Sequence, residues 1–277
     1  MSASSVLRRS MIAACAVAIA AGVLAHAQTP QQFKPESGQP GKDVVWVPTS
    51  HTLVAKMLDI ANVTAQDFVI DLGSGDGRTV IAAAKRGARA LGIEYNPDMV
   101  ELSKRNAAEA GVGDRAIFVK ADLFETDFSQ ATVITLFLLP EINLKLRPAI
   151  LNLKPGTRIV SNSFTMEDWE ADDTATVTED CSSWCTALLW IVPAKVEGTW
   201  RLPQGQLTLK QNFQMVSGML SSGGSTRAIT NGRLRGDRLS FEVNGAQYSG
   251  RVNGNSMAGT TKSAGKTTEW NATRTAQ

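Results

Sequence analysis

Short apolar stretches alternate with amphipathic helical patterns between Trp46 and about Ala194. The apolar stretches are typical of buried strands, and they lie at residues 67–70, 89–93, 117–120, 133–138 and 158–161. Strands that alternate with helices in this way favour a mainly parallel sheet with helices on both faces. We therefore expect residues 46–194 to form a doubly wound α/β domain.

The helical patterns between these strands carry recognisable start and stop signals. Ser50 or Thr49 can cap a helix whose apolar face is Leu53, Met57 and Ile60. Further helices are expected at residues 79–85, 97–110 and 142–153, the last interrupted at Pro148. Two more strands are expected near residues 174–178 and 187–192.

The pattern changes near Val196, where Gly, Ser, Thr and Asn become frequent. Short alternating stretches are separated by turn signals such as Asn244-Gly245, and they lie at residues 206–210, 214–220, 238–243, 247–252 and 268–273. Closely spaced strands with such turns predict an antiparallel meander, with closure into a small barrel left open. Residues 195–277 are therefore expected to form a small all-β domain.

The N-terminus carries the features of an export signal. Arg8 and Arg9 precede an apolar run at residues 11–25, and Ala25-His26-Ala27 fits a cleavage site. We expect residues 1–27 to be a signal peptide cleaved after Ala27, which predicts a periplasmic protein. The alternative is a membrane anchor through residues 11–25, although the run is short for a span. Residues 28–45, rich in Gln, Pro, Gly and Lys, are expected to be a flexible linker.

Charge and composition exclude two classes of site. Without residues 1–27, which hold two arginines and no acid, the chain has 26 basic and 26 acidic residues. A neutral chain without charge runs does not predict nucleic-acid binding, which needs clustered positive charge. One histidine, His51, and two cysteines remain, so a zinc site built from Cys and His is not expected. His51 could act as a base, although a surface position at a helix start explains it as well.

The most informative motif is Asp71-Leu-Gly-Ser-Gly-Asp-Gly-Arg78, which follows an apolar strand. A dinucleotide fingerprint would require a glycine where Arg78 stands, so the loop departs from the pyrophosphate pattern. The glycines at 73, 75 and 77 allow the backbone to approach a ligand closely. A carboxylate at the strand end suits a cationic or hydroxylated ligand better than a phosphate.

Two further acids end the next two expected strands. Glu94 could accept hydrogen bonds from ribose hydroxyls, and Asp122 could accept one from an adenine amino group. Together with Asp71, they would lie along the edge where open α/β sheets bind ligands. This joint arrangement is much less expected by chance than any single strand-end acid.

These motifs resemble those of the class I, or seven-β-strand, S-adenosylmethionine-dependent methyltransferases. The resemblance rests on the motif at 71–78, on Gly92-Ile-Glu-Tyr-Asn-Pro97 and on Val47-Pro48-Thr49. Phe137-Leu-Leu-Pro140 and residues 154–162 fit the same group. Within it, the chain is most similar to the lysine methyltransferases that act on the ATP synthase c-subunit and the adenine nucleotide translocase, with their bacterial relatives.

The resemblance implies a Rossmann-like sheet of seven strands, with S-adenosyl-L-methionine as the cofactor. Asp71, Gly73, Gly75 and Gly77 would then line the methionine part, Glu94 would hold the ribose, and Asp122 would hold the adenine. Pro48 and Thr49 would lie near the cofactor mouth, with Leu139 and Pro140 near the transferred methyl group. A protein lysine would be the methyl acceptor. The alternative is an exported, non-catalytic binding module on the same scaffold.

Cys181 and Cys185 are the two cysteines that remain after cleavage, and an oxidising compartment favours their pairing. In an extended strand, a spacing of four residues separates the Cα atoms by about 13 Å, which is too far for a disulfide. In a tight turn the separation falls to about 6 Å, which is allowed. We therefore expect the segment to turn and to carry a disulfide.

Overall fold

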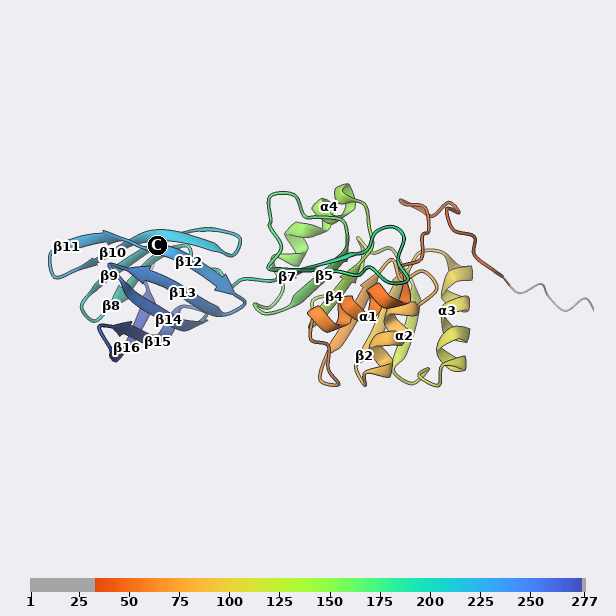
Figure 1. The fold of residues 1–277 in the computed structure, drawn as a ribbon, viewed down its shortest axis with the longest axis horizontal. Coiled ribbons are helices and arrows are strands. Elements are labelled where there is room, and N and C mark those ends of the chain that lie inside the picture. The colour runs from red at the N-terminus through yellow and green to blue at the C-terminus, as the bar shows by residue number, and fades with distance from the viewer. Residues whose placement is uncertain (1–32, 276–277) are drawn as a thin grey trace, which may run out of the picture. The chain divides into compact units, whose positions relative to one another are not determined.

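A computed structural model describes residues 33–275 of the chain (Figure 1). The export signal expected at residues 1–27 and the start of the expected linker lie outside the described residues. Within residues 33–275, no helix combines the length and the apolar character needed to cross a bilayer.

A seven-stranded sheet forms the first half of the described chain. Its strands follow one another in space in the order β3-β2-β1-β4-β5-β7-β6. Every neighbouring pair from β3 to β5 is parallel, whereas β7 runs antiparallel to both of its neighbours. The strands are β1 (Phe68–Leu72), β2 (Arg89–Glu94), β3 (Ala116–Lys120), β4 (Val133–Leu136), β5 (Arg158–Asn162), β6 (Asp173–Thr176) and β7 (Thr186–Ile191).

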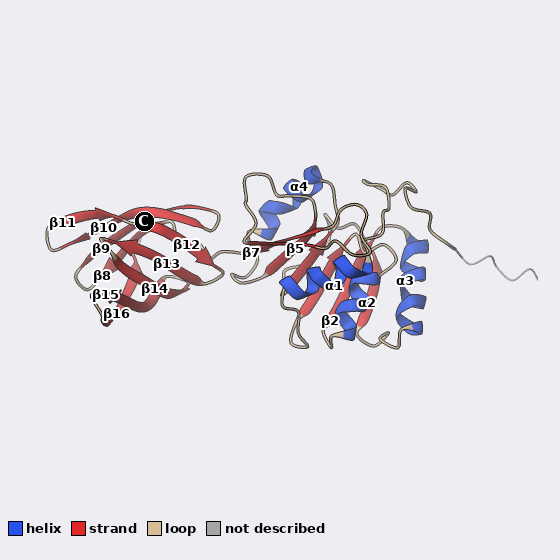
Figure 2. Ribbon diagram, viewed as in Figure 1, coloured by secondary structure: helices blue, strands red, loops and turns tan. Residues whose placement is uncertain are grey.

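Helices cover both faces of this sheet, which confirms the expected doubly wound architecture (Figure 2). One core lies beneath α1 (His51–Ile60), α2 (Arg78–Lys85) and α3 (Pro97–Glu109), and the other lies beneath α4 (Pro140–Ile150). The side chains of β1 divide between the two cores, with Val69 in the first and Ile70 and Leu72 in the second. This division follows from the alternation of side chains along a strand.

The helix ends are fixed by the signals visible in the sequence. The Ser50 hydroxyl accepts a hydrogen bond from the Leu53 N–H at 3.2 Å and caps α1. Asn96 caps α3 in the same way, with Pro97 at the first helical position. Pro148 lies inside α4 and does not end it, since the helix continues to Ile150.

Nine antiparallel strands form the C-terminal half, which confirms the expected all-β character. They are β8 (Gly198–Leu202), β9 (Gly205–Asn212), β10 (Met215–Ser222), β11 (Ser225–Ala228), β12 (Thr230–Arg235), β13 (Arg238–Val243), β14 (Ala246–Asn253), β15 (Ser256–Ser263) and β16 (Lys266–Arg274). Successive strands from β12 to β16 pair with one another, β16 pairs with β8, and β9 pairs with both β8 and β10. Because β10 also pairs with β12, the sheet closes on itself as a barrel.

The barrel interior is filled by side chains. Trp200, Phe241 and Trp270 lie in a buried apolar cluster to which almost every strand contributes. The ring of Phe241 stacks on that of Tyr248 with centroids 4.7 Å apart. The barrel therefore has an apolar core of its own.

Residues 38–45, expected to belong to a flexible linker, instead make specific contacts, including hydrogen bonds with Trp46 at the start of the expected α/β domain. Gly38 donates a backbone hydrogen bond to the Trp46 carbonyl at 2.8 Å, and Trp46 donates one to the Gln39 carbonyl at 2.9 Å. Composition favours flexibility here, but the side chains of Lys42 and Trp46 find partners on the α/β domain. Tertiary contacts of this kind leave no local sequence signal.

Candidate active site

The glycine loop after β1 depends on backbone conformations that favour glycine. Gly73, Gly75 and Gly77 have φ angles of +80°, +54° and +82°. The N–H groups of Gly73 and Ser74 both donate to the Ile93 carbonyl, at 2.9 and 3.0 Å, which ties the loop to the end of β2. A Cβ atom on Gly75 would lie 2.5 Å from Nε1 of Trp46. At Gly75 the loop therefore passes so close to Trp46 that any larger residue would require a shift.

Asp71 lines a cavity at this edge of the sheet. Its carboxylate is buried, and Oδ1 accepts a 2.6 Å hydrogen bond from the Thr135 hydroxyl of the adjacent strand β4. Burial raises the pKa of Asp71 to about 7, the hydrogen bond from Thr135 opposes this rise, and the carboxylates of Glu94 and Asp76 add to it. A cation placed in the cavity would favour the ionised form.

Glu94, at the end of β2, connects two backbone turns. One carboxylate oxygen accepts a hydrogen bond from the Gly75 N–H and the other accepts one from the Asn96 N–H, both at 2.9 Å. A carboxylate offers about four lone-pair positions, so each oxygen can still accept a bond from a ligand hydroxyl. Glu94 lines the same cavity as Asp71.

Asp122 follows β3 and also lines the cavity. Its Oδ1 accepts a 3.0 Å hydrogen bond from the Phe124 N–H, and its Oδ2 pairs with the ammonium group of Lys42. The hydrogen bond from Lys42 lowers the pKa of Asp122 and raises that of Lys42. The Lys42 Nζ atom also lies 4.9 Å from the centroid of the Tyr95 ring. The segment expected to be a linker thus reaches the cavity at this point.

Thr49 joins the start of α1 to the glycine loop. Its hydroxyl accepts a 3.2 Å hydrogen bond from the Asn162 side-chain amide, and its carbonyl accepts one from the Arg78 guanidinium at 2.6 Å. Arg78 in turn pairs with Asp76 at 2.5 Å. Thr49 and Pro48 both line the cavity.

Not every expected site residue contacts the cavity. Leu139 lines it, whereas Pro140, the first residue of α4, does not. Gly77 does not line it either, and its φ angle and close packing against Phe118 explain why a glycine is needed there. His51 is exposed at the start of α1, outside the cavity lining.

Among residues 33–275, no cluster of acidic, histidine or cysteine side chains suits a metal ion.

Three aromatic residues to which the sequence analysis gave no role in the site also line the cavity, in addition to Trp46 and Tyr95: Phe137, Phe164 and Trp184. The rings of Phe137 and Phe164 stack with centroids 5.8 Å apart, and Trp184 packs edge-on against Phe137 at 6.0 Å. Phe137 follows β4 and Phe164 lies two residues beyond β5. An aromatic residue just beyond a strand end is the signal that could have identified both.

The comparisons with known proteins agree with this geometry. The family model described as the ANTKMT methyltransferase domain matches residues 71–173. A protein-lysine N-methyltransferase of Saccharolobus islandicus (strain REY15A) is 41% identical over 152 residues, which cover 54% of this chain and 94% of the relative. The ATP synthase c-subunit lysine N-methyltransferase of Mus musculus is 32% identical over 162 residues, which cover 58% of this chain and 63% of the mouse protein.

A solved structure supports the same assignment. The crystal structure of a protein described as an RNA methyltransferase from Salinibacter ruber, in complex with S-adenosyl-L-homocysteine, is 47% identical with a TM-score of 0.51. The match covers 54% of this chain and 96% of that one. The glycine loop, the strand-end acids and these relatives lead to one conclusion: the chain belongs to the ANTKMT family of class I S-adenosylmethionine-dependent methyltransferases.

Proposed function

We propose that the protein transfers a methyl group from S-adenosylmethionine to the side-chain amine of a lysine in a protein substrate. The observation that carries the cofactor part is the set of three carboxylates, Asp71, Glu94 and Asp122, around one cavity. The acceptor part is supported by the relatives named as lysine methyltransferases.

The chemistry of this donor set fits the cofactor. The buried Asp71 carboxylate suits the cationic methionine end, and Glu94 keeps free lone pairs for ribose hydroxyls. Asp122 can accept a bond from the adenine amino group if it shares Oδ2 between that group and Lys42. The glycine loop allows the backbone to approach the methionine part, with Gly73 and Gly75 in the cavity lining.

S-adenosylmethionine, when bound, would supply a methyl group on a sulfonium. The lone pair of a neutral amine would form the new N–C bond, and the electron pair of the broken C–S bond would stay on sulfur in the thioether leaving group. The protein mainly has to align the amine with this methyl group. A lysine amine must also lose a proton, and burial against apolar side chains lowers its pKa in that direction. No histidine is among the described residues that line the cavity.

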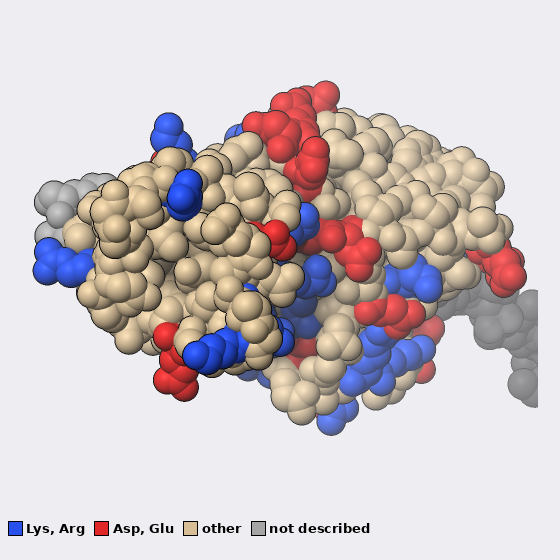
Figure 3. All heavy atoms as spheres, turned by 60° about the vertical axis from the view of Figure 1, so that its left-hand side comes forward, with Lys and Arg blue, Asp and Glu red and all other residues tan. Residues whose placement is uncertain are grey.

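One observation favours a second acceptor class, because the Salinibacter ruber relative is described as an RNA methyltransferase. RNA binding would require a concentrated basic surface. On the face shown in Figure 3, lysine and arginine side chains are interspersed with aspartate and glutamate. Together with the balanced charge of the chain after residue 27, this mixed face supports a protein acceptor.

We also propose that the protein is exported, with cleavage after Ala27. The support is the sequence of residues 8–27 and the joining of Cys181 to Cys185 by a disulfide.

The test is transfer of a radiolabelled methyl group from S-adenosylmethionine to a cell extract. The label is then followed separately in protein, RNA and small molecules, and labelled protein is hydrolysed to identify methyl-lysine. Glu94→Ala serves as the binding-deficient variant. Glu101→Ala is the matched control, because Glu101 is an exposed acid whose ion pair is with Lys104 on α3. Label found only in RNA would replace the lysine proposal with the RNA one.

A further inference from the structure

The two halves of the cavity edge differ in chemistry. Glu94 and Asp122 follow β2 and β3, on one side of the glycine loop after β1. Tyr95 lies on this side as well, directly after Glu94, with its ring near Lys42. A cluster of three aromatic rings comes from the other side: Phe137 follows β4, Phe164 follows β5, and Trp184 precedes β7. Because β7 is antiparallel to β5, its start lies at the same edge as the end of β5, with Asn162 opposite Ala187. The carboxylate half fits the cofactor, which leaves the aromatic half for the acceptor.

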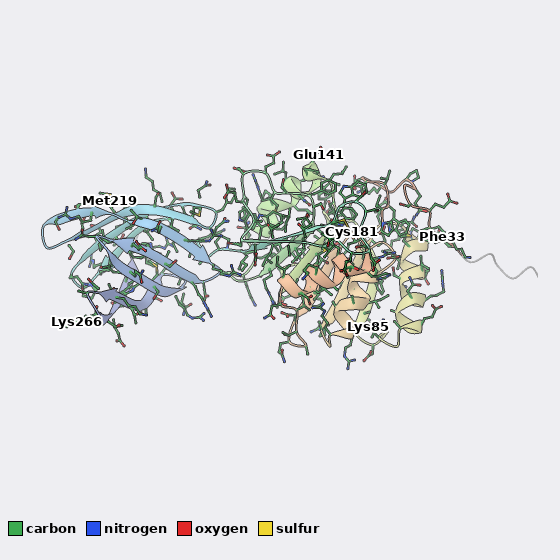
Figure 4. The ribbon with its side chains drawn as sticks, in the orientation of Figure 1. Phe33, Lys85, Glu141, Cys181, Met219 and Lys266 are labelled. Carbon is green, nitrogen blue, oxygen red and sulfur yellow. A yellow bond between two sulfur atoms is a disulfide. The ribbon has the colours of Figure 1, made fainter. Side chains whose placement is uncertain are left out.

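The disulfide closes the loop that carries Trp184. Cys181 and Cys185 are joined with their Cα atoms 5.8 Å apart, and Cys181, at one end of this loop, is labelled in Figure 4. Both cysteines pack against the core beneath α1, α2 and α3. The Val177 N–H donates to the Cys185 carbonyl at 2.9 Å, which continues the pairing of β6 and β7 up to the disulfide.

Trp184 has an unusual backbone and an unusual exposure for its size. Its φ angle is +53°, in the left-handed region that a bulky side chain rarely adopts, and Asp180 in the same loop has a φ of +51°. Such conformations persist only where the surroundings impose them. Trp184 is also 46% exposed, so burial in a core does not account for it. The loop holds a large ring at the cavity mouth against Phe137.

Grouped aromatic faces attract cations. An ammonium group within about 6 Å of a ring centroid interacts with the negative face of the ring, most strongly with tryptophan. Methylated ammonium groups are recognised by this chemistry in particular. A lysine side chain is the acceptor that such a set of rings would select. Its apolar stem contacts the rings, and its nitrogen is cationic when it binds, before it loses the proton for transfer, and again after methylation.

We propose that Phe137, Phe164 and Trp184 form the subsite for the acceptor amine, and that the Cys181–Cys185 disulfide is the device that positions Trp184 in it. This inference rests on the proposed lysine acceptor. Dithiothreitol would reduce the S–S bond to two thiols, becoming a cyclic disulfide itself, and would release the Trp184 loop. Amine binding would then weaken, whereas cofactor binding would not.

The subsite is tested by calorimetric titration of the protein saturated with S-adenosylhomocysteine. The probes are N-acetyl-trimethyllysine methylamide and its neutral isostere, in which carbon replaces the quaternary nitrogen. We expect the cationic probe to bind roughly three- to thirtyfold more tightly than the neutral one. Trp184→Ala should lose this preference, and Trp184→Phe should keep part of it. Met215→Ala, which removes an exposed apolar side chain from the barrel strand β10, should keep it in full.

The disulfide is tested with the double variant Cys181→Ser/Cys185→Ser and with reduced and reoxidised wild-type protein. The double variant and the reduced protein should behave like Trp184→Ala, and reoxidation should restore the preference. The affinity for S-adenosylhomocysteine should stay within about twofold in all of these samples. A disulfide that only positions Trp184 leaves the cofactor site intact, whereas one that supports the fold would not. If the double variant keeps the full preference, the disulfide has no positioning role.

Two other results overturn the subsite: no cation preference in the wild type, or a full preference in Trp184→Ala. A parallel loss of S-adenosylhomocysteine affinity in Trp184→Ala overturns it as well, because the loop would then only support the fold. Cation preference without methyl-lysine in labelled extracts would instead overturn the proposed lysine acceptor while the subsite stands. Methyl-lysine formed with an unchanged KM in Trp184→Ala would leave the function standing without the subsite.

Discussion

The Thr135 hydroxyl donates a 2.6 Å hydrogen bond to the Asp71 carboxylate, across the pairing of β4 with β1. Among the described residues, Thr135 is the side-chain hydrogen-bond partner of the buried Asp71. Because burial outweighs the hydrogen bond, the pKa of Asp71 lies near 7, well above its usual value of 3.8. We therefore expect this buried acid, which lines the cavity, to change its charge close to neutral pH.

Cofactor affinity should consequently depend on pH through Asp71. A cationic ligand favours the ionised carboxylate, so binding below the pKa of about 7 requires release of a proton. We expect the affinity for S-adenosylmethionine to fall as pH decreases below 7, by up to about tenfold per pH unit, and to level off above 8. Asp71→Asn should bind more weakly at pH 8 and lose most of this dependence. An equally steep dependence in that variant would assign the titration to another group.

The raised pKa of Asp71 should also affect the stability of the protein in the absence of ligand. The folded state favours neutral Asp71, so its stabilising contribution is complete below pH 3.8 and is lost as pH rises through about 7. Asp71→Asn should therefore have a free energy of unfolding roughly 1–3 kcal/mol higher than that of the wild type at pH 8, with a smaller difference at pH 5. Urea unfolding at the two pH values measures this difference. Asp114→Asn, on an exposed loop residue, is the control and should show no such change.

Glu94→Ala should weaken binding of S-adenosylhomocysteine by about 1–3 kcal/mol. The substitution removes the acceptor for ligand hydroxyls and leaves the N–H groups of Gly75 and Asn96 without their partner. Calorimetry measures the effect, with Glu101→Ala expected to bind as the wild type does. Unchanged affinity in Glu94→Ala would remove Glu94 from the ribose site.

Gly75→Ala should destabilise the protein more than Gly111→Ala does. Both glycines have a positive φ angle, so each alanine costs about 1 kcal/mol of backbone strain. A Cβ atom on Gly111 meets nothing within 4 Å, whereas on Gly75 it would overlap Trp46. We expect an additional cost of roughly 1–3 kcal/mol for Gly75→Ala. Urea unfolding measures the loss of stability in both variants. Equal losses would show that the loop or Trp46 shifts without a significant energetic cost.

A chain ending at Ala194 should bind cofactor as the full chain does, within about threefold. Every described residue that lines the cavity lies between Gln39 and Trp184, so the barrel adds none. Calorimetry with S-adenosylhomocysteine measures the affinity, and circular dichroism establishes that the shortened chain is folded. Loss of binding in a folded shortened chain would give the barrel a part in the site.

Protein purified from the periplasm should contain few free thiols after denaturation. Cys181 and Cys185 are joined in the structure, and after cleavage behind Ala27 the chain has no other cysteine. Thiol counting with a chromogenic reagent measures this directly. Two free thiols in most molecules would contradict both the disulfide and the proposed export, whereas a reduced sample provides the positive control.

The carboxylate half of the site was predictable because it follows a local rule. Asp71, Glu94 and Asp122 each end an apolar stretch, and the ends of parallel strands meet at one edge of a sheet. The glycines between 73 and 77 marked the turn in the same local way. Residue type, spacing and strand direction were enough to bring these side chains together.

The aromatic half of the candidate site depends on contacts between residues that are far apart in the sequence, which local patterns do not reveal. Trp184 lies 47 residues after Phe137, and nothing near either residue signals their contact. Lys42 reaches Asp122 from a segment whose composition favours flexibility. Likewise, β15 (Ser256–Ser263) was missed because it has little apolar alternation and is formed by pairing with both neighbours.

The pairing of β16 with β8 also sets an order of events during synthesis. The seven-stranded sheet has all of its strands once the ribosome has passed Ile191, whereas the barrel cannot close until residues 266–274 have been made. Domains fold as units, N-terminal ones first. The methyltransferase half can therefore complete its sheet while the barrel strands are still being translated, and closing the barrel is the slow, non-local step because it joins the first and last strands of that unit.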